Sequence, residues 1–124
     1  MIVFGDHTRI LKFINFDFAR GADGTQILLS NDPKLPQHLF YLTLLNVDLS
    51  NYHYARHFKF LKDIEIVVPS LEIADAFEAY AEKIYLLIKV IRDKNQLLKE
   101  ARDILLPRLM TGVIDVDTLM KDAA

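Results

Sequence analysis

The sequence of 124 residues has the length of one domain, and its hydrophobic fraction of 52% excludes a disordered or collagen-like chain. It contains no cysteine, which excludes disulfides, thiolate zinc sites and a cysteine nucleophile. The net charge of −2 gives no whole-surface attraction to nucleic acid. Its uncharged stretches are too short to cross a membrane, and the amino terminus lacks the pattern of a secretory signal, so we expect a cytoplasmic protein with no membrane partner.

The amino-terminal residues predict a small sheet with one helix. Apolar residues alternate over residues 2–14 around the turn-forming pair Gly5-Asp6, which is typical of a β-hairpin. Residues 26–29 have the composition of a short strand. Leucines then recur on one stripe of residues 34–46, as in a helix that packs on a sheet.

Residues 54–61 form a basic and aromatic run that we interpret as a loop. No acidic residue occurs from residue 52 to residue 62, so a positive patch is expected in an otherwise neutral domain. Arg56, Lys59 and Lys62 are candidates for contacts with DNA phosphates, the alternative being a solvated surface without a ligand. The two phenylalanines of the run are expected to anchor it on the core.

A strand and a very long helix are expected next. Residues 64–68 alternate as in a strand that Pro69 ends, and Ser70 is a suitable helix N-cap. The helical pattern is then unbroken up to Pro107. About 37 residues at about 1.5 Å each give a rod on the order of 55 Å long.

An apolar stripe with a seven-residue period runs along this helix and resembles the seam of a coiled coil. Lys94 and Asn95 interrupt the stripe near its middle, where polar residues can fix the register of a helix pair. The alternative is that the stripe packs on its own domain. The residues expected to pair with another helix are Phe77, Ile84, Leu87, Ile91, Leu98 and Leu105.

No catalytic or metal-binding pattern competes with these features. Asp6 and His7 are an acid next to a base, but adjacent residues of a strand or turn point apart, which argues against a catalytic dyad. The four histidines lack the spacing of a metal site on one helix face. We therefore expect no enzyme activity, no cofactor and no metal.

Five segments, taken together and in sequence order, give the chain a family resemblance. They are residues 3–9, 21–24, 54–61, 68–72 and 101–112. With these segments the chain resembles the carboxy-terminal portion of a specificity subunit of type I restriction-modification systems, and the resemblance runs nearly end to end. In that family a target-recognition domain is joined to a long spacer helix, and two such units lay their helices antiparallel to separate two DNA half-sites.

The resemblance implies a division into three parts. Residues 1–69 would be a target-recognition domain, residues 70–111 the spacer and dimerisation helix, and residues 112–124 a tail. Only four residues precede the Gly5-Asp6 motif, where the family has a substantial segment, so we expect the recognition domain to be partial. The expected fold is α+β, with a small mixed β-sheet, one packed helix and a long amphipathic helix.

The implied function is DNA recognition without catalysis. The chain would bind double-stranded DNA and position the methyltransferase and restriction subunits, and its helix would pair with a second copy or with another specificity half. The alternative is a truncated assembly module that acts through the helix without reading DNA. The residues expected to contact DNA are Tyr54, Arg56, His57, Lys59, Lys62, His7, Thr8 and Arg9.

Overall fold

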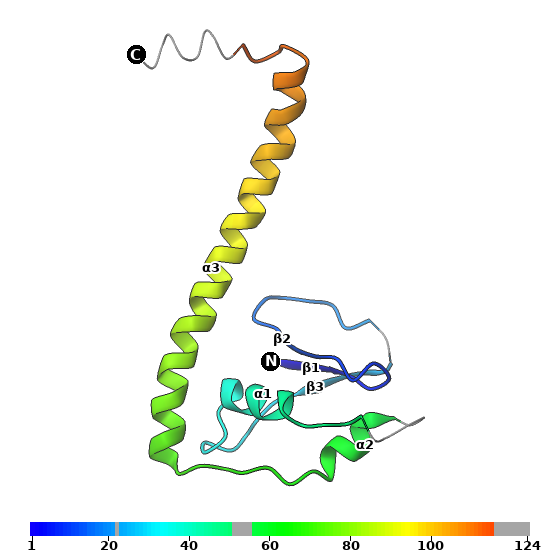
Figure 1. The fold of residues 1–124 in the computed structure, drawn as a ribbon, viewed down its shortest axis with the longest axis vertical. Coiled ribbons are helices and arrows are strands. Elements are labelled where there is room, and N and C mark those ends of the chain that lie inside the picture. The colour runs from blue at the N-terminus through cyan, green and yellow to red at the C-terminus, as the bar shows by residue number, and fades with distance from the viewer. Residues whose placement is uncertain (22, 51–55, 116–124) are drawn as a thin grey trace. The chain divides into compact units, whose positions relative to one another are not determined.

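The structure, a computed structural model, describes residues 1–21, 23–50 and 56–115. The chain divides into two compact units, unit 1 (Met1–Tyr85) and unit 2 (Leu86–Ala124). Unit 1 holds a small sheet and short helices, and one long helix begins in unit 1 and forms most of unit 2 (Figure 1). The predicted α+β class with a long helix is confirmed.

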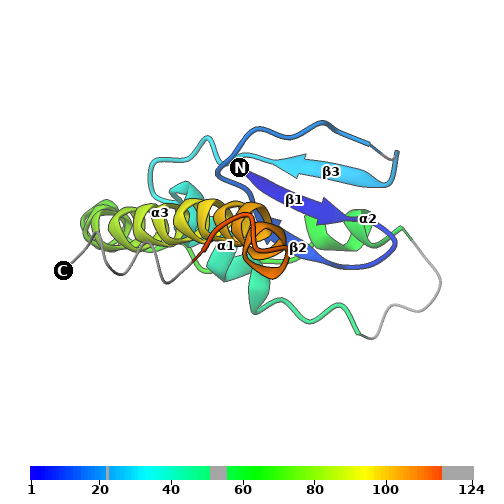
Figure 2. The same cartoon turned by 90° about the horizontal axis from the view of Figure 1, so that it is seen from above.

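The sheet consists of β1 (Ile2–Gly5), β2 (Leu11–Phe13) and β3 (Thr25–Leu28). Its strand order is β2-β1-β3, so β1 is central (Figure 2). Both pairs of strands are antiparallel. The expectation of a mixed sheet is therefore wrong for the described strands. Residues 6–10 join β1 to β2 as a hairpin, and residues 14–24 lead from β2 to β3, which pairs antiparallel with the other edge of β1.

The core of unit 1 lies between the sheet and helix α1 (Gln37–Leu45). Ile2 and Phe4 are 0% and 1% exposed, because alternate side chains of the central strand point to the same face. Leu44 of α1 packs against them. This confirms the helix predicted from the leucine stripe, with bounds a few residues shorter.

Two local predictions are wrong. Residues 57–62, interpreted as part of a loop, form helix α2 (His57–Lys62), whose buried residues His57 and Leu61 lie one helical turn apart. Residues 64–68 form no strand. Ile64 and Ile66 are partly buried and Glu65 between them is exposed, so the alternation exists, but it reflects contact with one apolar surface instead of pairing with another strand.

Helix α3 (Leu71–Met110) has 40 residues, close to the expected residues 70–111, and it continues through Pro107, up to which the sequence pattern is unbroken. A proline loses one backbone hydrogen bond, but the helix continues for one more turn. It ends before Gly112, whose φ of 71° is in the left-handed region and whose N–H donates to the carbonyl of Leu109 at 3.2 Å. None of the described helices is both long and apolar enough to cross a membrane.

The first turns of α3 belong to unit 1 and pack on the rest of it through one face. Ala74 and Ala81 are buried, and Glu78 and Tyr85 continue the same face at helical spacing. His38 Nδ1 of α1 lies 2.5 Å from Glu78 Oε1. The His38 ring stacks on Tyr85 with a centroid distance of 4.5 Å.

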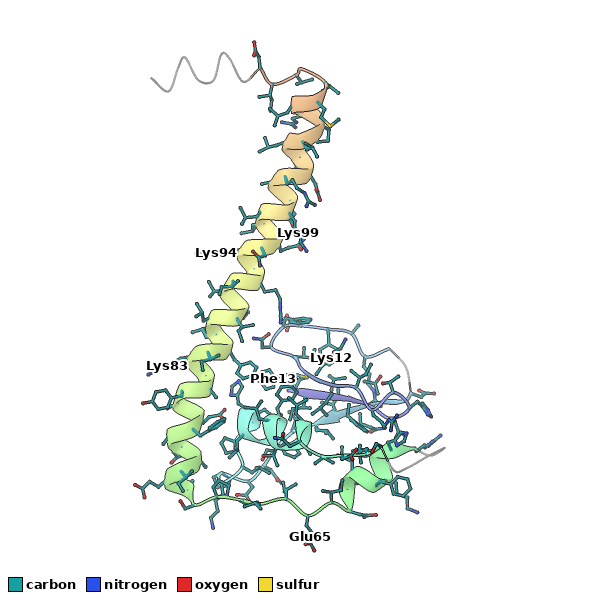
Figure 3. The ribbon with its side chains drawn as sticks, viewed as in Figure 1. Lys12, Phe13, Glu65, Lys83, Lys94 and Lys99 are labelled. Carbon is teal, nitrogen blue, oxygen red and sulfur yellow. The ribbon has the colours of Figure 1, made fainter. Side chains whose placement is uncertain are left out.

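An aromatic cluster completes this contact. Phe13 of β2 lies 4.6 Å from His38, 5.5 Å from Tyr41 and 4.8 Å from Tyr85, measured between ring centroids. Figure 3 shows Phe13 on the side of the sheet that faces α3. Small alanines let the helix approach closely, and the aromatic rings then fill the space beside it, so the start of α3 is an integral part of unit 1.

Candidate functional site

The turn between β1 and β2 is held by Asp6, which is 4% exposed. Its backbone N–H donates to the carbonyl of Gly24 at 2.8 Å. Its carboxylate Oδ1 accepts from the N–H of Phe58 at 2.8 Å, and its carbonyl accepts from the N–H of His57 at 3.2 Å. Asp6 therefore caps the first turn of α2, which has no side-chain cap of its own, from a position 52 residues away in sequence.

The rest of the turn depends on close backbone approach. A Cβ atom on Gly5 would lie 2.3 Å from Thr8 Oγ1, so a side chain at this position requires the Thr8 side chain to move. Arg9 has a φ of 59°, in the left-handed region, and its N–H donates to the carbonyl of Gly5 at 2.8 Å. Arg9 Nη1 also donates to the carbonyl of Leu49 at 3.2 Å, so part of the guanidinium holds the structure together.

His7 lies against the chain that leads into β3. A Cβ atom on Gly24 would meet His7 Cδ2 at 2.9 Å, which shows how closely the imidazole covers that glycine. His7, Thr8 and Arg9 are nevertheless exposed to solvent. The turn therefore presents these three side chains as predicted, and their role in DNA binding stays a prediction.

Helix α2 carries the basic residues of the predicted patch. Arg56, Lys59 and Lys62 are all exposed. Lys62 Nζ lies 5.0 Å from the centroid of the Phe58 ring, a cation–π distance. Phe58 and Phe60 are partly buried and pack against the core, which confirms their predicted anchoring role.

His57 is not on this surface. Its side chain is 6% exposed, and its Nδ1 atom is buried without a hydrogen-bond partner in the described part of the chain. The prediction of an exposed DNA-contacting position for His57 is therefore wrong, because the first turn of α2 directs this side chain inward. Tyr54, the remaining member of the predicted set, lies outside the described residues.

The hydrogen bonds of Asp6 bring the turn and α2 together. Two segments that the sequence offered as separate candidates thus lie side by side, with the start of α2 bonded to the turn. The sequence predicted Asp6 as part of a turn but not as the cap of α2, since a capping residue 52 positions away leaves no local pattern.

A second feature that the sequence did not predict is the hollow beside Arg9. A hollow of about 370 Å³ lies beside Arg9, with Phe4 and Leu44 in its floor and Asp48 at its rim. Hydrogen bonds from Ser50, followed by the charge of Arg9, lower the pKa of Asp48 below its ordinary value. The Asp48 carboxylate is therefore ionised at neutral pH and partly offsets the positive charge of Arg9.

The apolar stripe of α3 is largely exposed. Ile84 in unit 1 is 58% exposed, and in unit 2 Leu98 is 67% exposed. Leu87, Ile91 and Leu105 are also exposed, whereas Phe77, near the start of the helix, is partly buried.

This stripe lies roughly a third of a turn around the helix from the Ala74–Ala81 face, at 3.6 residues per turn. Within unit 1, Ile84 therefore lies outside the face that Ala74 and Ala81 bury. Lys94, labelled in Figure 3, projects from the same helix.

The described residues hold no group of three side chains suited to bind a metal ion. Comparisons with family models, with curated proteins and with solved structures found no match to this chain.

Proposed function

We propose that this chain is a DNA-recognition component of a type I restriction-modification complex, in which it positions the methyltransferase and restriction subunits and makes no catalytic contribution itself. The observation that carries this proposal is that α3 has two different faces. One face of its first turns packs on the rest of unit 1, and the other, which is apolar, is exposed up to residue 105. A helix with this division can hold a domain at one end and join a partner along its length.

The basic neighbourhood of unit 1 supports a DNA contact. Arg56, Lys59 and Lys62 lie on or next to one short helix. Asp6, which directly precedes the exposed residues 7–9, accepts hydrogen bonds from the start of that helix. Each phosphate contact from such residues adds affinity that falls steeply with salt. We expect a few contacts only, because Arg9 already donates to Leu49 and Lys62 already contacts Phe58.

The charges on the apolar stripe favour antiparallel pairing of α3, as the family resemblance implies. If Ile84, Ile91 and Leu98 are one heptad position, Lys94 and Arg108 fall on the neighbouring seam position. Parallel pairing in register would set each of these cations opposite its own copy, which is destabilising. Antiparallel pairing can place each cation opposite a different residue.

The alternative function is assembly without DNA reading. Two observations favour it. His57 is buried and so cannot contact DNA, and part of the Arg9 guanidinium is engaged by the carbonyl of Leu49. In that case the helix would join subunits, and the basic patch would only be solvated.

A titration separates the two functions. The full chain is titrated against a mixed-sequence DNA duplex by fluorescence anisotropy at about 50 and about 200 mM salt, where a few phosphate contacts predict a loss of affinity of roughly tenfold to a hundredfold. Arg56→Ala should weaken binding. Lys34→Ala, which removes an exposed lysine from a loop outside this neighbourhood, is the matched control. Absence of binding at the lower salt would refute DNA recognition by this chain alone and leave assembly.

A further inference from the structure

Strand β3 forms an outer edge of the described sheet, since its only described neighbour is β1. The hydrogen bond from Asp6 N–H to Gly24 and the register of Phe4 with Gln26 show which residues face β1. In an antiparallel pair the hydrogen-bonded positions alternate, so Gln26 and Leu28 bond to β1. The backbone N–H and C=O groups of Thr25, Ile27 and Leu29 consequently point away from the sheet.

This edge lacks the side chains that usually protect an outer strand, although β3, with four residues, is short. Natural edge strands are often guarded by lysines, prolines or inward-pointing charges. The segment of residues 24–30 has no charged residue and no proline. Ile27 and Leu29 on it are 39% and 67% exposed. An uncharged, β-prone edge of this kind is a template for another strand.

Each face of the sheet has a hollow beside this edge. Leu28 lines a mainly apolar hollow of about 260 Å³ together with Phe40 and Phe58, and Lys62 is its one charged lining residue. Ile27 lines a hollow of about 270 Å³ whose other lining residues are Met1, Phe16, Phe18 and the charged Asp17 and Arg20. Neighbouring residues of a strand point to opposite faces, so the two hollows lie on opposite sides of β3. A cavity of about 150 Å³ can hold a benzene ring, so each hollow has room for a large apolar side chain.

We propose that the β3 edge pairs antiparallel with the same edge of a second copy of this chain, centred on Leu28. In this register Leu28 lies opposite the partner's Leu28, on the side of one hollow. Ile27 lies opposite the partner's Leu29 and Leu29 opposite the partner's Ile27, on the side of the other.

The sequence of the strand favours a second copy as the occupant. Only apolar residues meet at the three central positions, and no charge of one copy meets a charge of the other within residues 24–30. The outward-facing groups of Ile27 and Leu29 would exchange hydrogen bonds with the same groups of the partner, as an isologous contact requires. This contact is separate from the pairing of α3 and does not rest on the proposed function.

Cysteine cross-linking tests the register, because the chain has no cysteine of its own. In the proposed pair the two residues 28 occupy a non-hydrogen-bonded site with a Cα separation of about 4.5 Å, which a disulfide can bridge. Leu28→Cys should therefore give a covalent dimer under mild oxidation.

Gln26→Cys is the matched control on the same strand. The two introduced thiols would lie four residues out of register, about 13 Å apart, beyond the reach of a disulfide. Thiol labelling of both variants before oxidation confirms that both thiols react. Equal cross-linking of the two variants, or none with Leu28→Cys, would overturn the proposal.

A second measurement does not depend on substituting a partly buried residue. Leu29→Lys adds a charge to an exposed position of the edge and should weaken self-association, measured by sedimentation equilibrium, by about tenfold or more, since the charge would be desolvated in the pair. Ile10→Lys, at a position 52% exposed elsewhere in unit 1, is the control. Equal association of Leu29→Lys and wild type would refute the contact.

The helix contact is tested apart by Leu98→Lys in the Leu28→Cys background. The cross-link should persist, because residue 98 lies in unit 2 and outside the β3 edge. Its loss would show that the thiols meet only when the helices pair, and it would overturn an independent β3 interface while leaving the proposed function intact.

Discussion

The cap that Asp6 provides to α2 makes a sharp prediction about the whole predicted DNA surface. Asp6→Ala removes the acceptor of the 2.8 Å bond from Phe58 N–H and leaves that N–H at the start of α2 without its partner. A hydrogen bond to a charged group contributes about 1.5–3 kcal/mol. Removing a carboxylate that is 4% exposed also relieves part of its desolvation cost, so we expect a net loss of about 2 kcal/mol.

The loss should appear first in α2. About 2 kcal/mol corresponds to roughly 30-fold faster amide exchange at Phe58, measured by NMR hydrogen exchange. Global stability is followed in urea by the near-ultraviolet circular dichroism of the tyrosines, because the chain has no tryptophan and the far-ultraviolet signal is dominated by α3.

Asp6→Asn is the control for this prediction, since its amide oxygen can still accept from Phe58 N–H. We expect Asp6→Asn to lower the free energy of unfolding by less than half as much as Asp6→Ala does. If Asp6→Ala changed neither the exchange of Phe58 nor the global stability by more than about 0.5 kcal/mol, the long-range cap would not hold α2 in place. Equal losses for both variants would also refute the hydrogen bond as the cause.

Two further predictions concern the turn and the aromatic cluster. Gly5→Ala should cost about 1–2 kcal/mol in urea unfolding, because its Cβ would lie 2.3 Å from Thr8 Oγ1, and adding Thr8→Ala should restore most of the loss; equal stability of the single and double variants would contradict this. Burial, followed by the nearby Tyr41, raises the pKa of Tyr85 above 10.0. The folded state thus holds the phenol proton more tightly than the unfolded state, so this stabilisation is complete below pH 10 and is lost as the pH rises through the folded pKa. Tyr85→Phe should flatten the alkaline decline of the melting temperature, and the exposed Tyr80→Phe should leave it unchanged.

The helices that sequence predicted correctly are those whose signal is local and repeated. The leucine stripe of α1 and the long uninterrupted pattern of α3 each extend over several turns, so periodicity alone identifies them. The end of α3 at Met110 lies within one residue of the expected end at residue 111, although Pro107 precedes it, and the left-handed Gly112 follows two residues later.

The features that sequence reasoning missed depend on distant residues. Helix α2 has six residues and takes its cap from Asp6, so its own pattern is too short to distinguish a helix from a loop. The inward direction of His57 follows from that helix, and a loop interpretation placed it on the surface. Ile64 and Ile66 alternate as a strand would, but the strand order of the sheet leaves them no described partner.

The breadth of the apolar face in unit 2 bears on what α3 can bind. Besides the predicted stripe, Val90, Leu97 and Ile104 are 41%, 65% and 56% exposed and also recur every seven residues. Neighbouring residues of a helix lie about 100° apart, so this second stripe is about 100° from Ile91, Leu98 and Leu105.

A two-helix pair buries only one narrow seam. Covering about half of each of ten stripe residues, the five exposed ones from each helix, contributes roughly 1 kcal/mol per residue, or about 10 kcal/mol in all, which is within the estimated cost of association of about 4–15 kcal/mol. The second stripe would stay exposed in such a pair, and its burial would add a comparable amount. We therefore expect a third helix that covers the second stripe to tighten an assembly formed through α3.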